Sequence, residues 1–95
     1  MDLIKAMFTA TGYEPKEKLF LLALAYYFNQ QTKSAPCSYG AINEYTDLTF
    51  AEIGEITLKL SNMGLLVWET TTLNEFDVYH EFRFQGELKQ IVDQC

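Results

Sequence analysis

The sequence predicts an α+β fold in which helices come first and a β-hairpin follows. Apolar residues recur at helical spacing as far as Gly64, and then alternate with polar residues as far as Phe84. Capping and turn residues separate the periodic segments. The chain has 95 residues, of which 48% are hydrophobic. This length suffices to bury one core and is too short for a two-domain enzyme, so we expect residues 1–95 to form a single domain.

Two helices are expected in the first third of the chain. Asp2 can cap a short helix over about residues 2–11, which Gly12 would end. Its apolar side consists of Leu3, Ile4, Met7 and Phe8. Pro15 suits the first turn of a second helix, which continues through Tyr26 and is apolar nearly all round. We therefore expect the second helix to be central and buried, and the polar residues 29–36 to form a loop.

Two further helices are predicted before Gly64. Ser38 can cap a short helix that ends near an inward-facing Tyr45, and a tight turn follows at residues 46–48. Thr49 and Glu52 have the spacing of a capping box, which starts the next helix. The apolar stripe of this helix is Ile53, Ile56, Leu60 and Met63. Gly64 would end it in the left-handed conformation.

The last third predicts a hairpin and a short helix. Residues 65–72 read as a strand, residues 73–75 as its turn, and residues 76–84 as the return strand. On the return strand one face would carry Phe76, Val78, His80, Phe82 and Phe84, and the other Asp77, Tyr79, Glu81 and Arg83. A short helix over about residues 87–94 has the apolar residues Leu88, Ile91 and Val92.

This order of elements resembles the winged helix-turn-helix domains of phage and plasmid replication initiators and related regulators. The resemblance rests on Leu-Leu-Ala-Leu-Ala at 21–25, Thr-Asp-Leu-Thr at 46–49, and Leu-Ser-Asn-Met-Gly-Leu-Leu at 60–66. It covers a core of about residues 15–84, and the helices over 2–11 and 87–94 flank this core. It implies a three-helix core with a β-hairpin wing, in which the third helix enters the major groove of DNA.

The distribution of charge is the opposite of what DNA binding requires. Eight acids and one base, Lys59, lie between Tyr39 and Phe82, so this half carries −8 + 1 = −7 of a total charge of −6. We therefore hypothesise an acidic face that binds a basic protein partner. Its members are Glu44, Asp47, Phe50, Glu52, Glu55, Glu69, Glu75, Asp77 and Tyr79. The same acids could equally be a solvated face that keeps a small domain soluble.

The acidic-face hypothesis predicts an adaptor, inhibitor or antagonist, by analogy an accessory protein of a mobile element. It also predicts that Glu52→Lys together with Glu55→Lys abolishes partner binding and leaves the fold intact. The alternative is a DNA-binding transcription or replication regulator. The residues in contact with DNA would be Thr49, Phe50, Ala51, Glu52, Glu55 and Lys59, and Lys16 and Lys18 would lie near the DNA backbone. Lys5, Lys33, Arg83 and Lys89 could add to it if they converge on one face.

The remaining residues suggest no catalytic, metal-binding or redox site. Cys37 and Cys95 belong to no metal or redox motif, and His80 is expected to pack between strand neighbours. We expect no catalysis, cofactor or metal, no membrane span, and a cytoplasmic location. Two stripes outside the core are expected either to cover the central helix or to form a homodimer: Leu3, Ile4, Met7, Phe8, Leu88, Ile91 and Val92. Gly54, in the middle of the third core helix, could allow a close approach of another backbone or of a partner surface, or could simply be tolerated at a cost of about 1 kcal/mol.

Overall fold

The computed structural model of the protein describes residues 2–72 and 78–95. Within them the chain has an α+β fold with five helices and three strands. The elements in chain order are α1 (Leu3–Thr9), α2 (Pro15–Tyr27), β1 (Ala35–Cys37), α3 (Tyr39–Thr46), α4 (Phe50–Asn62), β2 (Leu66–Thr72), β3 (Val78–Phe84) and α5 (Gly86–Asp93). The turn expected at residues 73–75 and the strand residues Phe76 and Asp77 lie outside the described residues.

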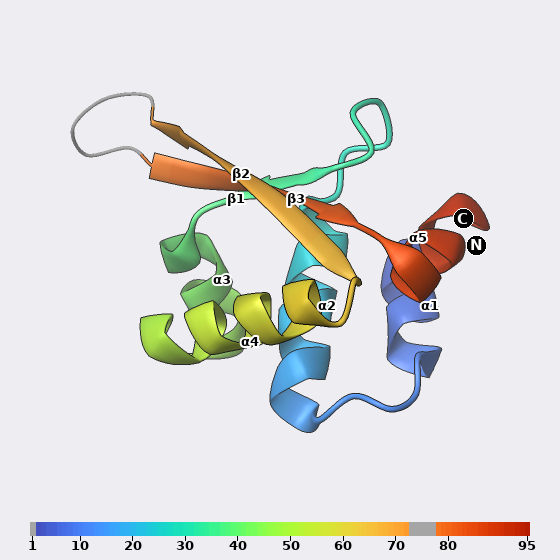
Figure 1. The fold of residues 1–95 in the computed structure, drawn as a ribbon, viewed down its shortest axis with the longest axis horizontal. Helices are drawn as coiled ribbons and strands as arrows, with labels where there is room; N and C mark the ends of the chain where they lie inside the picture. The colour runs from blue at the N-terminus through green and yellow to red at the C-terminus, as the bar shows by residue number, and fades with distance from the viewer. Residues whose placement is uncertain (1, 73–77) are drawn as a thin grey trace.

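The strands form one antiparallel sheet in the order β1-β3-β2. Figure 1 shows α2, α3 and α4 on one side of this sheet, and α1 and α5 together at one end. On the central strand, Phe82 is the register partner of both Ala35 in β1 and Trp68 in β2. Phe82 is buried and meets the ring of Phe20 edge-on at 5.8 Å. The core therefore lies between the inner face of the sheet and α2.

The predicted helix starts are confirmed. The side chains of Asp2 and Ser38 accept hydrogen bonds from the first turns of α1 and α3, and Pro15 is the first residue of α2. Thr49 and Glu52 form the expected capping box. At the end of α4, Gly64 has φ +75°, a left-handed conformation that glycine adopts without a steric penalty.

The prediction of a loop over residues 29–36 is wrong at its end. Residues 29–34 form a turn, but Ala35–Cys37 is a strand that pairs with β3. The side chains of Ala35 and Cys37 are buried, and Pro36 between them is exposed. A three-residue strand carries too short an alternation to be recognised, and Pro36 signals a loop.

The predicted inward orientation of two residues is also wrong. Tyr45 is 56% exposed, and Met63 is 55% exposed beyond the end of α4. In the central helix α2, Tyr26 is 57% exposed. Because α2 is apolar nearly all round, periodicity cannot identify which of its sides the neighbours cover. Helix α1 also ends earlier than expected, at Thr9.

Candidate functional site

The structure does not bring the predicted acidic face together as one surface. Glu44 and Asp47 lie at the end of α3, and Phe50, Glu52 and Glu55 lie on α4. Glu69 and Tyr79 belong to the sheet, where they alternate with inward-facing residues such as Trp68 and Phe82. Their side chains therefore point to the outer face, away from the helices. Glu75 and Asp77 lie outside the described residues.

Glu52 is engaged within the protein. Its carboxylate accepts a hydrogen bond from the Nζ of Lys16, which forms an ion pair between α4 and the start of α2. It also accepts a bond from the backbone N–H of Thr49 at 3.0 Å, as part of the capping box. The Lys16 ammonium and the Thr49 N–H together lower the pKa of Glu52 to about 2. Glu52 is therefore a structural residue that joins α4 to α2.

Lys59, the one base in the acidic half, is also paired. Its Nζ lies 2.5 Å from the Oε2 of Glu17, whose side chain is buried between α2 and α4. Burial alone would raise the pKa of Glu17, but the Lys59 ammonium and the backbone N–H of Glu14 keep this pKa below its usual value. Lys59 thus neutralises a buried carboxylate.

These contacts determine which of the predicted DNA-binding residues remain available to bind a ligand. Lys16 and Lys59 are ion-paired, and the Nζ of Lys18 donates to the carbonyl oxygen of Phe8 at 2.5 Å. Thr49 caps α4, so among the remaining candidates only Phe50, Ala51 and Glu55 are exposed. In the described part of the chain, the outer side of α4 therefore presents no cation without a carboxylate partner.

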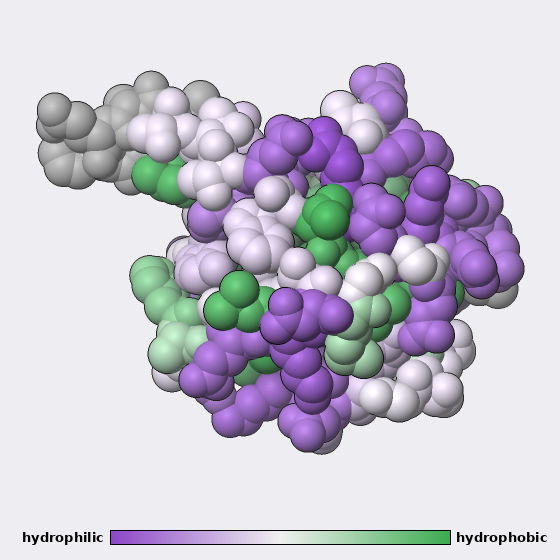
Figure 2. Space-filling view, in the orientation of Figure 1, coloured by the Kyte–Doolittle hydropathy of each residue, from purple (hydrophilic) through white to green (hydrophobic). Residues whose placement is uncertain are grey.

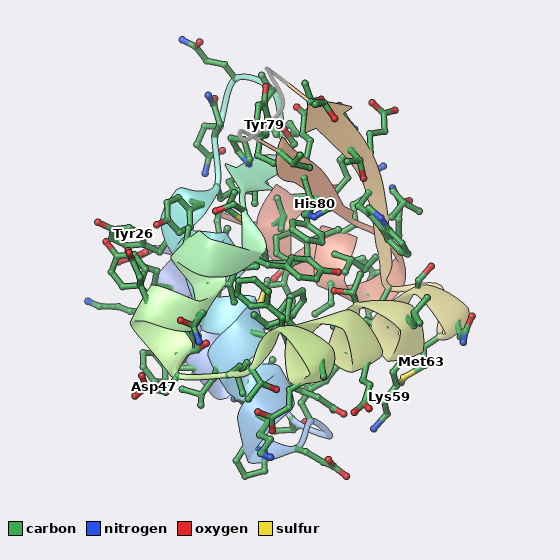
Figure 3. The ribbon with its side chains drawn as sticks, turned by 90° about the vertical axis from the view of Figure 1, so that its left-hand side faces the viewer. Tyr26, Asp47, Lys59, Met63, Tyr79 and His80 are labelled. Carbon is green, nitrogen blue, oxygen red and sulfur yellow. The ribbon has the colours of Figure 1, made fainter. Side chains whose placement is uncertain are left out.

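The exposed side of α4 is apolar and acidic instead. We call the residues Phe50, Ala51, Glu55, Leu58 and Met63 the α4 surface. The side chains of Phe50, Leu58 and Met63 are 59%, 57% and 55% exposed. Figure 2 shows apolar atoms among hydrophilic ones over this helix, and Figure 3 places Met63 and Lys59 toward one end of it. Sequence reasoning missed Leu58, although it falls outside the buried stripe of Ile53, Ile56 and Leu60.

Three tyrosines form a second exposed apolar group, which we call the tyrosine cluster. The ring of Tyr26 lies 5.2 Å from that of Tyr27 and 4.9 Å from that of Tyr45, between centroids. The two exposed hydroxyls, on Tyr26 and Tyr45, are 3.4 Å apart. Figure 3 shows Tyr26 on the same side of the molecule as Asp47. The cluster therefore adds aromatic surface beside the acids at the end of α3.

His80 packs as predicted. Its ring centroid lies 4.7 Å from that of Tyr39 and 5.8 Å from that of Phe82, and burial lowers its pKa. Its Nδ1 is 3.1 Å from the Oγ1 of Thr70. A histidine held in this way between aromatic rings serves packing.

Most residues of the predicted dimer stripe lie in the core of the single chain, as the alternative of a cover for the central helix predicts. Leu3, Met7, Leu88 and Val92 are buried in the core of a single chain, where α1 and α5 pack together. Ile4 and Ile91 are partly buried against the same core. Of the seven residues only Phe8 is largely exposed, at 62%. The terminal helices therefore cover the core of the single chain.

The described residues also bear on metal sites, membrane-spanning helices and reactive thiols. They contain no group of three or more His, Cys, Asp or Glu side chains that could hold a metal ion. None of their helices has the length and apolar character that crossing a bilayer requires. Cys37 and Cys95 are free thiols, and burial raises the pKa of Cys37 to about 12. Comparison of the chain with protein-family models, with curated proteins and with solved structures gave no match.

Proposed function

We propose that the chain is a winged-helix protein that binds another protein through the α4 surface. The fold proposal is supported by the order of α2, β1, α3, α4 and the β2–β3 ribbon, and by the pairing of β1 with β3. The turn at Asp47, which has φ +60°, joins α3 to α4 as a helix-turn-helix requires. In this arrangement α4 is the helix that a DNA-binding relative would place in the major groove.

The ion pairs of Lys16 and Lys59 are the observation that carries the functional proposal. Phosphate contacts need available cations, and both lysines beside α4 already form ion pairs, with Glu52 and Glu17, that would compete with such contacts. The exposed Glu55 would repel a phosphate backbone. The apolar side chains of Phe50 and Leu58 would instead supply the anchors of a protein interface.

The chemistry of the surface also describes the partner. An exposed helix face with apolar anchors suits a hydrophobic groove. Glu44, Asp47 and Glu55 are exposed around it and have no ion pair within the described residues, so a basic rim on the partner would be complementary. A protein that normally binds nucleic acid has such a rim. We therefore propose an adaptor, inhibitor or antagonist of a basic, nucleic-acid-binding protein.

A titration against random duplex DNA tests the choice between protein and DNA. At about 50 mM salt, where non-specific binding is strongest, we expect no binding by fluorescence anisotropy. Binding that weakens steeply with added salt would overturn the proposal and favour a DNA-binding regulator.

Site-specific photo-cross-linking tests the α4 surface. A cross-linking residue at position 58 should capture a basic protein in extracts of the source organism, whereas one at Leu19, a 40% exposed residue of α2, should not. Glu55→Lys should weaken this capture. Glu52→Lys is unsuitable, contrary to the sequence-based prediction, because it would break the capping box and the ion pair with Lys16. Equal capture from both positions, or capture unaffected by Glu55→Lys, would contradict the proposal.

A further inference from the structure

Three of the seven basic residues line one small cavity, which we call the basic cavity. Lys33, Arg83 and Lys89 surround a space of about 220 Å³ between the turn at residues 29–34, the end of β3 and α5. Asp93 is the one acid in its lining, and Glu81 and Glu69 outside the lining lie 3.5 and 3.9 Å from Arg83, so Lys33 and Lys89 are the two cations of the cavity without an ion pair in the described residues. Figure 1 shows this turn and α5 on the side of the molecule away from α3 and the start of α4.

The cations of the basic cavity are less engaged than those beside α4. The Nζ of Lys33 contacts only the amide oxygen of Gln30, at 3.1 Å, and Lys89 has no ion pair within residues 2–72 and 78–95. Arg83 lies 3.5 Å from Glu81 and 3.9 Å from Glu69, beyond the roughly 2.7–2.9 Å of a charge-assisted hydrogen bond. These guanidinium and ammonium groups can therefore donate to a bound anion.

Two of these cations belong to residues whose backbone is fixed by hydrogen bonds, Lys33 in the turn and Arg83 in β3. The turn before β1 is closed by a hydrogen bond from Asn29 N to Ser34 O at 2.7 Å, and another runs from Lys33 N to Asn29 O at 2.8 Å. Lys33 has φ +57°, a conformation that non-glycine residues seldom adopt. Arg83 lies on the central strand of the sheet, opposite Val67. Two of the three side chains thus extend from hydrogen-bonded backbone.

One wall of the basic cavity is aromatic. Phe28 and Phe84 both line it, with ring centroids 6.1 Å apart. Phe84 is buried and Phe28 is partly exposed, so Phe28 offers the accessible ring face or edge. A ligand held by the cations could therefore place an apolar group against Phe28.

We propose that the basic cavity binds the phosphate group of a small phosphorylated molecule. A phosphate dianion can accept paired hydrogen bonds from the Arg83 guanidinium and further bonds from the two ammonium groups. The volume is below the roughly 300–1,000 Å³ of most ligand pockets, which limits the ligand to a small one. The net charge of −6 repels a polyanion at long range, and this disfavours nucleic acid as the source of the phosphate.

Calorimetric titrations with phenyl phosphate and with inorganic phosphate test this proposal. We expect phenyl phosphate to bind more tightly, because its ring can contact Phe28. Lys89→Gln and Lys33→Asn should each weaken binding about tenfold, the usual effect of removing one charged hydrogen bond. The matched control is Lys5→Gln, which removes an exposed lysine that does not line the cavity and should leave the affinity unchanged.

Three results would overturn the proposal. The first is that neither phosphate binds to the wild-type protein. The second is equal weakening by Lys5→Gln, which would mean that only net charge matters. The third is that a short single-stranded oligonucleotide binds more tightly than phenyl phosphate with a steep salt dependence, which would assign the phosphate to nucleic acid. Circular dichroism of each variant separates lost binding from lost folding.

Discussion

Two glycines show how differently the same residue type can be used. Gly86 has φ +57°, and a Cβ built on it would lie 2.9 Å from the carbonyl oxygen of Gly64. Gly54 lies inside α4, where a Cβ would meet only the hydroxyl of Tyr39, at 3.9 Å. Within the described residues, therefore, no other segment of backbone approaches Gly54 closely. The sequence shows both as isolated glycines and cannot distinguish them, because the neighbour of Gly86 comes from a distant part of the chain.

We predict that alanine has opposite effects at these two positions. Gly54→Ala should stabilise the protein by about 1 kcal/mol, because alanine favours the helix and fits without a clash. Gly86→Ala should destabilise it by more than 1 kcal/mol, because it combines a left-handed backbone with a steric overlap. Thermal unfolding followed by circular dichroism measures both. A lower melting temperature for Gly54→Ala would contradict the packing seen around Tyr39.

At the level of elements, the local signals were predictable and the contacts between elements were not. The capping box of Thr49 and Glu52 needs only residues three apart, and the sequence shows it directly. The ion pairs that join α2 to α4 link residues 36 and 42 positions apart, so no local pattern contains them. For the same reason the split of the acidic residues between α4 and the outer face of the sheet emerges only from the register of β2 and β3.

The α2–α4 contact should give stability a defined dependence on pH. Because the folded-state pKa of Glu17 is lowered, its carboxylate stabilises the fold above the ordinary value of 4.5, and this stabilisation is lost as the pH falls through the folded pKa. Glu17→Gln should therefore cost about 1 kcal/mol at pH 7. The difference in melting temperature from wild type should shrink below pH 4.5.

Glu55→Gln is the matched control for this experiment, because Glu55 is an exposed carboxylate on α4. Its melting temperature should follow that of the wild type at every pH. A difference between wild type and Glu17→Gln that stays constant from pH 7 to pH 3 would contradict the role given to Glu17.

At the scale of the whole molecule, the α4 surface and the basic cavity lie on different sides. The acidic and apolar α4 surface lies on one side, and the basic cavity lies on the other. The terminal helices α1 and α5 cover one end of the core, where Leu88 is fully buried. The number of acids and bases in each part of the sequence predicted the acidic half. The convergence of Lys33, Arg83 and Lys89 depends on tertiary structure, so the sequence does not show it.

We predict that α5 is required for stability and that α1 does not mediate dimerisation. Leu88→Ala should destabilise the protein by about 2–4 kcal/mol, because it empties a fully buried site. Phe8→Ser should change stability by less than about 0.5 kcal/mol, because Phe8 is 62% exposed. Chemical denaturation measures both variants. Sedimentation velocity that changes with Phe8→Ser would show that the exposed end of α1 takes part in self-association.

The strand order has a consequence for colloidal behaviour. Since β3 is central, β2 is paired on one side only within the described residues, and alternate residues of β2 direct their backbone donors and acceptors to the other edge. An open strand edge is a template on which further strands, and eventually aggregates, can grow. Glu69, the one charge in β2, lies at its middle, where stacking like charges would oppose that growth. This carboxylate thus acts as a gatekeeper for solubility, a role that its position in the sheet explains without any binding partner.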